Sequence, residues 1–182
     1  MSVPLIETRL SSEKILSGHF LQVYRDTVVL PDNTTATREY IDHPGAVMIL
    51  PVLSDGRLLM ERQFRYPIGR VMWEFPAGKI DPHEQQDPLA TAKRELAEET
   101  GYTASYWQHF HTHHPLIAYA NERIECYLAT GLTAGAAHPD AGEFLEVLCV
   151  PPAECEAAIL DGRITDGKTC ATYFIAKAKG LL

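Results

Sequence analysis

The chain has 182 residues, of which 46% are hydrophobic and 22% are charged, which suits one globular domain or a core domain with a small appendage. Its net charge of −8 argues against partners with an anionic surface, such as nucleic acids and acidic membranes. An anionic small-molecule substrate stays compatible with this charge, because bound metal ions and a few arginines can reverse the local sign.

The cysteines and the N-terminus indicate a reducing compartment. No C-x-x-C pair occurs, and the first residues, MSVPLIETRL, contain neither the basic nor the apolar segment of a secretory leader. No apolar run approaches the length of a membrane span. We therefore expect a cytoplasmic protein without a membrane segment, with reduced thiols at Cys126, Cys149, Cys155 and Cys170.

Residues 1–43 predict an N-terminal antiparallel β-region. Strand character occurs at residues 14–16 and 20–30, a turn at residues 31–34, and a returning strand in TATREYI. A β-meander of this size has too little core to be stable alone. We expect it to pack on the main domain, residues 44–182, or on a second subunit.

The main domain begins with strands. Residues 46–53, AVMILPVL, are almost all apolar, which is typical of a strand that is buried on both faces. A hairpin turn and the strand LLMERQFR follow, then a short strand at residues 71–75 and a loop at residues 76–86. After a central helix, the sequence predicts strands at residues 106–114, 122–132 and 144–150, and helices at residues 151–164 and 166–182.

The central helix has clear boundaries. Asp87 suits the N-cap, Pro88 the first helical position and Gly101 the C′ position that follows the last turn. Its buried stripe is expected to consist of Leu89, Ala92 and Leu96.

This helix also carries Glu95, Glu98 and Glu99, which share one face because they are three and four residues apart. Like charges so close together destabilise a bare helix, and hard divalent cations would neutralise them. A solvated acidic face is the alternative interpretation. The Pro-Ala-Gly loop in front of the helix favours a metal site.

A run of histidines invites a different metal hypothesis, because three of them alternate and would share one strand face. Zinc would need a fourth ligand and hydrogen-bonding partners that the sequence does not show. We therefore favour a polar, partly exposed strand for His109, His111, His113 and His114.

Gly78, Glu84 and the run RELAEETGY at residues 94–102 resemble the motif of the Nudix hydrolases, G-x5-E-x7-R-E-U-x-E-E-x-G-U, where U is a bulky apolar residue. Two extra residues before Arg94 lengthen the loop and leave the helix intact. The stretches WEFPAGKID, QFR and REY are similar to the ADP-ribose pyrophosphatase branch. The resemblance implies an α/β fold, namely an α/β/α sandwich with a mixed sheet, and an N-terminal β-region that exchanges between the subunits of a homodimer.

By this resemblance, the helix supplies the metal site for Mg²⁺ or Mn²⁺. Glu95 and Glu99 would bind the metal, Glu98 would join them directly or through water, and the carbonyl of Ala77 would complete the site. Arg94 would orient the glutamates. Metal ions can polarise phosphoryl oxygens and acidify bound water, as hydrolysis of a pyrophosphate requires.

The general base is expected on a late loop, where related pyrophosphatases carry a D-E-x-E-like run. Glu143 is the one glutamate in the corresponding run, Asp140-Ala141-Gly142-Glu143. A solvated loop acid is the alternative interpretation of Glu143. We favour the base, because loops often carry catalytic groups.

The resemblance also assigns substrate contacts. Arg65 is expected to bind phosphate, because a guanidinium binds phosphate oxygens through two parallel hydrogen bonds. The resemblance places Arg38, His19 and Phe20 near the adenine and its phosphate, and Glu74 and Glu122 near sugar hydroxyls. For Phe20, ordinary packing within the hairpin is the favoured alternative.

The implied reaction is hydrolysis of ADP-ribose to AMP and ribose 5-phosphate. Another nucleoside diphosphate sugar or a dinucleotide, such as GDP-mannose or NADH, is the alternative substrate. A nucleotide sensor without catalysis is a third hypothesis. It is disfavoured because such domains usually lose glutamates that this helix retains.

Overall fold

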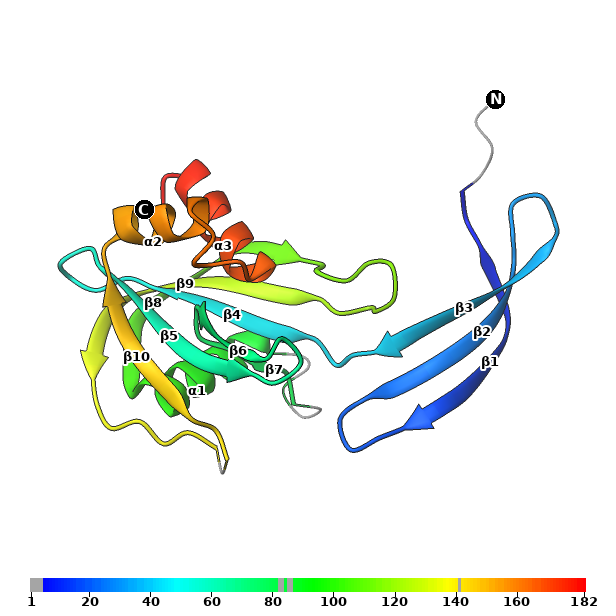
Figure 1. Cartoon of the computed structure of the whole chain (residues 1–182), viewed down its shortest axis with the longest axis horizontal. Coiled ribbons are helices and arrows are strands. Elements are labelled where there is room, and N and C mark those ends of the chain that lie inside the picture. Colours follow the sequence, from blue (N-terminus) through cyan, green and yellow to red (C-terminus); the bar gives the residue numbers. More distant parts are fainter. Residues whose placement is uncertain (1–4, 82–83, 85–86, 141) are drawn as a thin grey trace.

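The computed structural model describes residues 5–81, 84, 87–140 and 142–182. The N-terminal part is an antiparallel sheet in the order β1-β2-β3, and it projects away from the remaining chain (Figure 1). Its strands are β1 (Thr8–Ser17), β2 (Gln22–Val29) and β3 (Thr35–Asp42). β1 is longer than the predicted residues 14–16, because most of its length pairs with β2 despite two register shifts.

The main part contains two further sheets. One has the order β10-β5-β6, with β5 (Leu58–Arg65), β6 (Arg70–Glu74) and β10 (Leu145–Val150). The other has the order β7-β4-β9-β8, with β4 (Ala46–Pro51), β7 (Ala77–Lys79), β8 (Tyr102–His113) and β9 (Ile124–Ala134). β4 pairs with β9 in parallel and with β7 antiparallel, so this sheet is mixed, as predicted.

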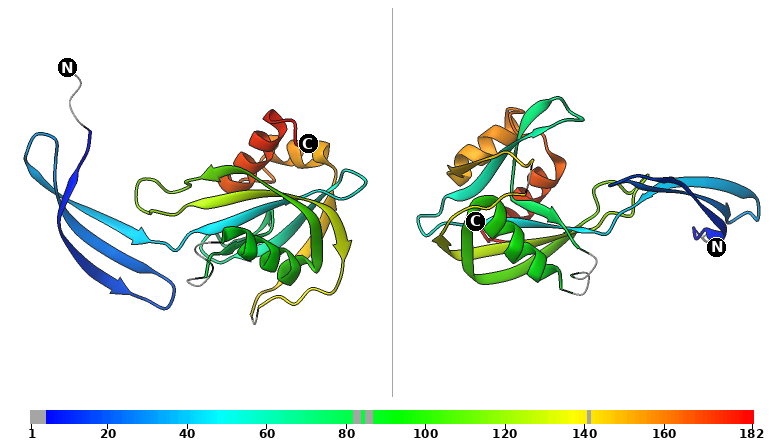
Figure 2. Two further views of the ribbon diagram at one scale, coloured as in Figure 1. Left: turned by 180° about the vertical axis from the view of Figure 1, so that it is seen from behind. Right: turned by 90° about the horizontal axis from the view of Figure 1, so that it is seen from below.

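The core lies on both faces of β4, whose six residues are all buried. Met48 and Leu50 pack in one cluster with residues of α2 (Pro152–Leu160) and α3 (Gly167–Ala178). Val47 and Ile49 pack in the other with α1 (Pro88–Thr100). Figure 2 shows α1 on the opposite side of the β4-containing sheet from α2 and α3. The predicted α/β/α layering is confirmed.

α1 begins and ends where its sequence predicts. The Asp87 side chain accepts a hydrogen bond of 3.3 Å from the Ala90 N–H, and Pro88 is the first helical residue. Gly101 has φ 75°, a left-handed conformation that glycine adopts without strain, and its N–H donates to the Ala97 carbonyl. Ala92 and Leu96 are fully buried. These caps fix the helix on which the acidic residues stand.

β7 corrects one prediction. The sequence places residues 76–86 in a loop, whereas Ala77–Lys79 pair with β4 over Met48, Val47 and Ala46. A three-residue strand has no detectable periodicity, and its hydrogen bonds come from β4, which is distant in sequence. This pairing fixes the backbone of Ala77–Lys79 next to the end of α1 that carries Glu99.

The N-terminal sheet is attached to the main part through the loop at residues 114–123. The Ile41 N–H donates to the Tyr119 carbonyl at 2.8 Å. The Asn121 amide donates to Asp42 at 2.7 Å and accepts from the His43 N–H at 2.7 Å. In the part of the chain that the structure describes, no helix is long and apolar enough to span a membrane.

Candidate functional site

The acidic residues of α1 meet β7 at close range. The Ala77 N–H donates to Glu99 Oε2 at 3.1 Å, and Glu99 is only 5% exposed. A Cβ atom at Gly78 would lie 1.9 Å from Glu95 Cδ, so no other residue fits there without moving that carboxylate. The glycine therefore allows Glu95 to lie directly against the backbone of β7.

Arg94 binds several carboxylates at once. Its terminal nitrogens lie 3.0 Å from Glu95, 2.8 Å from Glu98 and 3.2 Å from Glu84. Glu84 also accepts a hydrogen bond of 2.9 Å from the Thr91 hydroxyl. The two extra residues in the loop therefore leave Glu84 in contact with the helix.

The late loop brings Glu143 towards the same carboxylates. Gln63 of β5 donates to Glu143 Oε1 at 3.2 Å. The charge of Glu143 contributes to the raised pKa values of Glu95 and Glu99, so the three side chains share one electrostatic environment. This arrangement brings together a helix, a strand and a loop that are far apart in sequence.

Burial governs ionisation in this site. Desolvation raises the pKa of Glu99 to about 10, and the charges of Glu61 and Glu95 add to the effect. Desolvation also raises the pKa of Glu95 to about 7, although Arg94 opposes the shift. Without an additional cation, burial therefore favours the protonated form of Glu99 at neutral pH.

A second group lies at the end of β5 and β6. Glu74 is 1% exposed, and Arg65 donates to it at 2.6 and 2.8 Å. Lys168, at the start of α3, also pairs with Glu74. The sequence predicted Arg65 and Glu74 but missed Lys168, because no motif of the Nudix type includes the third helix. Glu74 is engaged with these cations rather than open to a sugar hydroxyl.

Phe20 and Glu122 meet at a cleft of about 200 Å³ that is also lined by Arg65, Gly78 and Lys168. The Phe20 ring lies 4.6 Å from Lys79 Nζ and makes an edge contact with the His43 ring. Glu122 lies 3.8 Å from His43. The tip of the N-terminal hairpin thus reaches the cleft that contains the phosphate-binding candidates.

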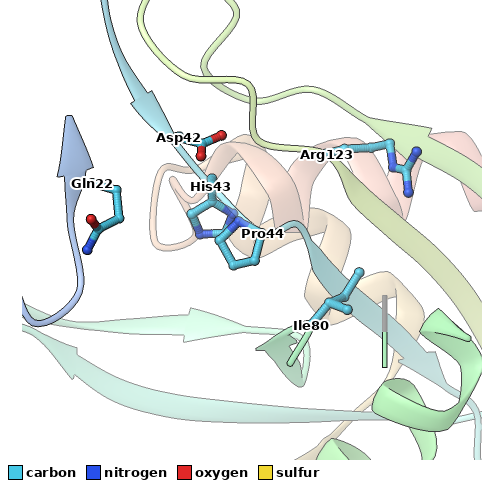
Figure 3. Close-up of a pocket in the computed structure, with 6 residues that line it drawn as sticks. All are labelled: Gln22, Asp42, His43, Pro44, Ile80 and Arg123. Carbon is cyan, nitrogen blue, oxygen red and sulfur yellow. The ribbon is translucent and has the colours of Figure 1, made fainter. Parts of the chain in front are cut away.

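A larger cavity, of about 410 Å³, lies next to this cleft between the N-terminal sheet and the main part. Figure 3 shows Gln22 of β2 on one side, Arg123 and Ile80 on the other, and His43 and Pro44 between them. Its lining is mostly polar. The cavity therefore has the position and chemistry to receive part of an extended polar ligand.

Other predicted residues lie elsewhere in the single chain. Arg38 of β3 pairs with Glu7 at 2.5 Å, on the projecting sheet. His19 is exposed in the turn between β1 and β2. Neither residue contacts the carboxylates of α1 within this chain. Of the histidine run, His109 pairs with Glu125 at 2.7 Å.

Comparisons with known proteins identify the family. A model described as the NUDIX domain matches residues 42–171. The chain belongs to the Nudix family. A second model, the nucleoside diphosphate sugar hydrolase N-terminal domain, matches residues 7–41. Both matches confirm the predicted class, a Nudix hydrolase of nucleoside diphosphate sugars.

Individual relatives support this assignment. The chain is 35% identical to an ADP-ribose pyrophosphatase of Bacillus subtilis over 91% of this chain and 89% of the relative. It is 30% identical to a GDP-mannose pyrophosphatase of Yersinia enterocolitica over the whole of both chains. A crystal structure of an ADP compounds hydrolase has the same fold, with a TM-score of 0.84 and 21% identity over the whole of both chains.

Nudix hydrolases generally use divalent metal ions. In the described segments, no three acidic, histidine or cysteine side chains are already arranged around a metal position. In this structure Arg94 binds Glu95 and Glu98, while Glu99 accepts the Ala77 N–H. The donor set nevertheless fits a hard cation, because it consists of carboxylates, and the buried Glu99 has no cationic partner among the described residues.

We predict that the protein loses stability with rising pH when EDTA keeps it free of metal. The folded-state pKa values of Glu95 and Glu99 exceed their unfolded values. Their stabilising contribution is therefore complete below the unfolded pKa and is lost as pH rises through about 7 and about 10. Thermal unfolding across this range tests the prediction.

Saturating Mn²⁺ should flatten or reverse this trend, because a cation favours the ionised carboxylates. Glu99→Gln removes one of the titrating groups and should weaken the pH dependence of the metal-free protein. A metal-free protein whose melting temperature rises steadily over the same interval would contradict the prediction.

Proposed function

We propose that this protein hydrolyses the pyrophosphate bond of ADP-ribose, giving AMP and ribose 5-phosphate, with Mg²⁺ or Mn²⁺ as cofactor. The observation that carries the proposal is the junction of an acidic Nudix helix with a cationic cleft. Glu95 and Glu99 lie against β7, and Arg65 and Lys168 line the cleft beside Gly78. The 35% identity to an ADP-ribose pyrophosphatase supports the choice of substrate.

The cationic side chains would bind the diphosphate. Arg65 uses Nε and one terminal nitrogen to bind Glu74, which leaves its other N–H donors for phosphate oxygens. Glu74 holds both cations, so it would position Arg65 and Lys168 rather than bind sugar alone. In a cleft partly shielded from water, such fixed charges stabilise the negative charge of the transition state.

The acidic side chains would hold the cation and move the proton. Glu95, Glu98, Glu99 and the Ala77 carbonyl would bind the metal, which supplies charge neutralisation and acidifies water. Glu143 would accept the proton of the attacking water as a phosphorus–oxygen bond of the diphosphate breaks. Arg94, bonded to Glu95 and Glu98, would orient these ligands.

The nucleoside end would lie towards the N-terminal sheet. Phe20 reaches the cleft and presents a ring that is 54% exposed, so a base could stack on it. Glu122 lies in the same cleft and would accept hydrogen bonds from ribose hydroxyls. We place His19 and Arg38 at this end as well, Arg38 through a second subunit.

The alternative substrate is another nucleoside diphosphate sugar, and the relative named as a GDP-mannose pyrophosphatase favours it. Comparing kcat/KM for ADP-ribose, GDP-mannose and NADH separates these substrates. Absence of turnover with all three, in the presence of Mg²⁺ or Mn²⁺, would overturn the enzymatic proposal and favour a nucleotide sensor.

We predict that Glu99→Gln and Glu143→Gln both lower turnover but differ in their effect on Mn²⁺ binding. Glu99→Gln should weaken Mn²⁺ binding and lower turnover of ADP-ribose on the order of 100-fold or more, because a metal ligand is lost. Glu143→Gln should lower turnover by about 100-fold while Mn²⁺ binding persists, because only proton transfer is impaired. AMP release and calorimetric Mn²⁺ titration measure both effects.

Glu154→Gln is a matched control, since it removes one carboxylate from α2, where Glu154 pairs with Arg163 away from the site. It should retain full turnover. Normal turnover in Glu143→Gln would remove Glu143 from the mechanism without affecting the assignment of the metal ligands.

We also propose a cytoplasmic homodimer in which the N-terminal β-region, residues 1–43, packs on the Nudix domain, residues 44–182, of a second copy. All ten residues of β1 are exposed in the single chain. Leu10 is 60% exposed and Ile6 is 79% exposed. An uncovered strand with exposed apolar side chains is unfavourable in water, and a second copy would cover it. Four free thiols fit the reducing cytoplasm.

The predicted consequence is that Leu10→Glu shifts the protein from dimer to monomer at micromolar concentration, because a charge replaces an apolar contact. Ser11→Glu is the control, since it places the same charge beside it at a position that is already polar. Light scattering coupled to size exclusion measures the mass. A wild-type protein that is monomeric under these conditions would refute the dimer.

A further inference from the structure

Glu61 occupies an unusual position in the middle of β5. Its cross-strand neighbours are Glu74 on β6 and Val147 on β10. Leu59, two residues earlier, packs in the cluster beneath α1. Because side chains two residues apart lie on the same face of a strand, Glu61 projects to the α1 side of the sheet. No sequence motif identifies Glu61 itself, although its neighbour Glu74 is a predicted site residue.

Glu61 is 1% exposed, and neither Oε1 nor Oε2 has a hydrogen-bond partner among the described residues. A buried carboxylate without a partner is strongly unfavourable, and proteins normally satisfy it with hydrogen bonds, a paired charge or a metal ion. The fold alone does not explain this residue, because an apolar side chain at this position would complete the cluster around Leu59.

The cations that act on the pKa of Glu61 are already engaged. Arg65 and Lys168 influence Glu61 electrostatically, yet both bind Glu74. The charge of Glu61 acts on Glu99, and Glu143 acts on Glu61. The two unpaired oxygens therefore share an electrostatic environment with Glu99 and Glu143.

We propose that Glu61 of β5 is a further metal-binding residue of this site, which holds a divalent cation together with Glu99 of α1. The inference rests on the metal site of the proposed function and adds to it a ligand outside the Nudix motif. The cation would supply the positive charge that both buried carboxylates lack. Carboxylate oxygens are the ligands that Mg²⁺ and Mn²⁺ prefer.

An inert, permanently protonated Glu61 is the competing explanation, and Glu61→Gln distinguishes the two. Glutamine has the shape of the protonated acid but carries no charge. Calorimetric titration with Mn²⁺ should show a dissociation constant that is at least about tenfold weaker in Glu61→Gln than in the wild type. Unchanged Mn²⁺ affinity would overturn the proposal. Glu154→Gln, an exposed carboxylate on α2, should bind Mn²⁺ as the wild type does.

Glu61→Leu provides a second readout that does not depend on activity. Leucine removes the unpaired carboxylate, so the metal-free variant should melt at a higher temperature than the metal-free wild type. The rise in melting temperature that Mn²⁺ produces in the wild type should shrink in this variant. An equal Mn²⁺-induced rise in both proteins would overturn the proposal.

These measurements separate the inference from the proposed function. A wild type that binds Mn²⁺ through Glu61 but does not cleave ADP-ribose would refute the substrate and leave the ligand intact. A wild type that cleaves ADP-ribose and loses no Mn²⁺ affinity in Glu61→Gln would refute the ligand alone. A wild type without Mn²⁺ binding at millimolar concentration would refute both.

Discussion

The burial of carboxylates on α1, β5 and β6 is the constraint on which the rest of the structure depends. Glu61, Glu74 and Glu99 are 1%, 1% and 5% exposed. A buried charge requires a partner of opposite sign, and among the described residues only Glu74 of these three has such partners, in Arg65 and Lys168. Arg94 of α1 pairs with Glu95 and Glu98 instead. Glu61 and Glu99 therefore lack the positive charge that a divalent cation would supply.

Apolar packing keeps this imbalance in place. Ala92 and Leu96 of α1 belong to the same cluster as Val47, Ile49 and Leu59 of the two sheets. The helix therefore cannot turn its carboxylates into solvent without breaking buried contacts. Functional groups on rigid, packed elements keep their geometry better than groups on loops. Glu143 comes from a loop rather than from a packed helix or strand, so it can move at a lower cost.

The sequence predicted those features that depend on neighbouring residues. The caps of α1 and the burial of β4 follow from Asp87, Gly101 and an unbroken apolar run, and the structure confirms them. β7 was missed because β4 supplies its pairing, and Lys168 because α3 lies far along the chain. Glu61 did leave a signal. It stands two residues after Leu59, at an inward position of a strand, where a charge contradicts the apolar pattern. Such a contradiction often indicates function, because local rules are broken where a ligand requires it.

The division of the site between two regions bears on specificity. The carboxylates, Arg65 and Lys168 all belong to the Nudix domain, and their positions are fixed by its core. Phe20 belongs to the N-terminal sheet, which is tied to that domain through few contacts, among them those of Asn121 with Asp42 and His43. A small change in these contacts would move the ring without disturbing the carboxylates. Under the proposed function, substrate choice could therefore change while the proposed hydrolytic centre stays constant. Such a division would be compatible with one fold whose relatives are named for ADP-ribose and for GDP-mannose, both aligned along nearly the whole of this chain.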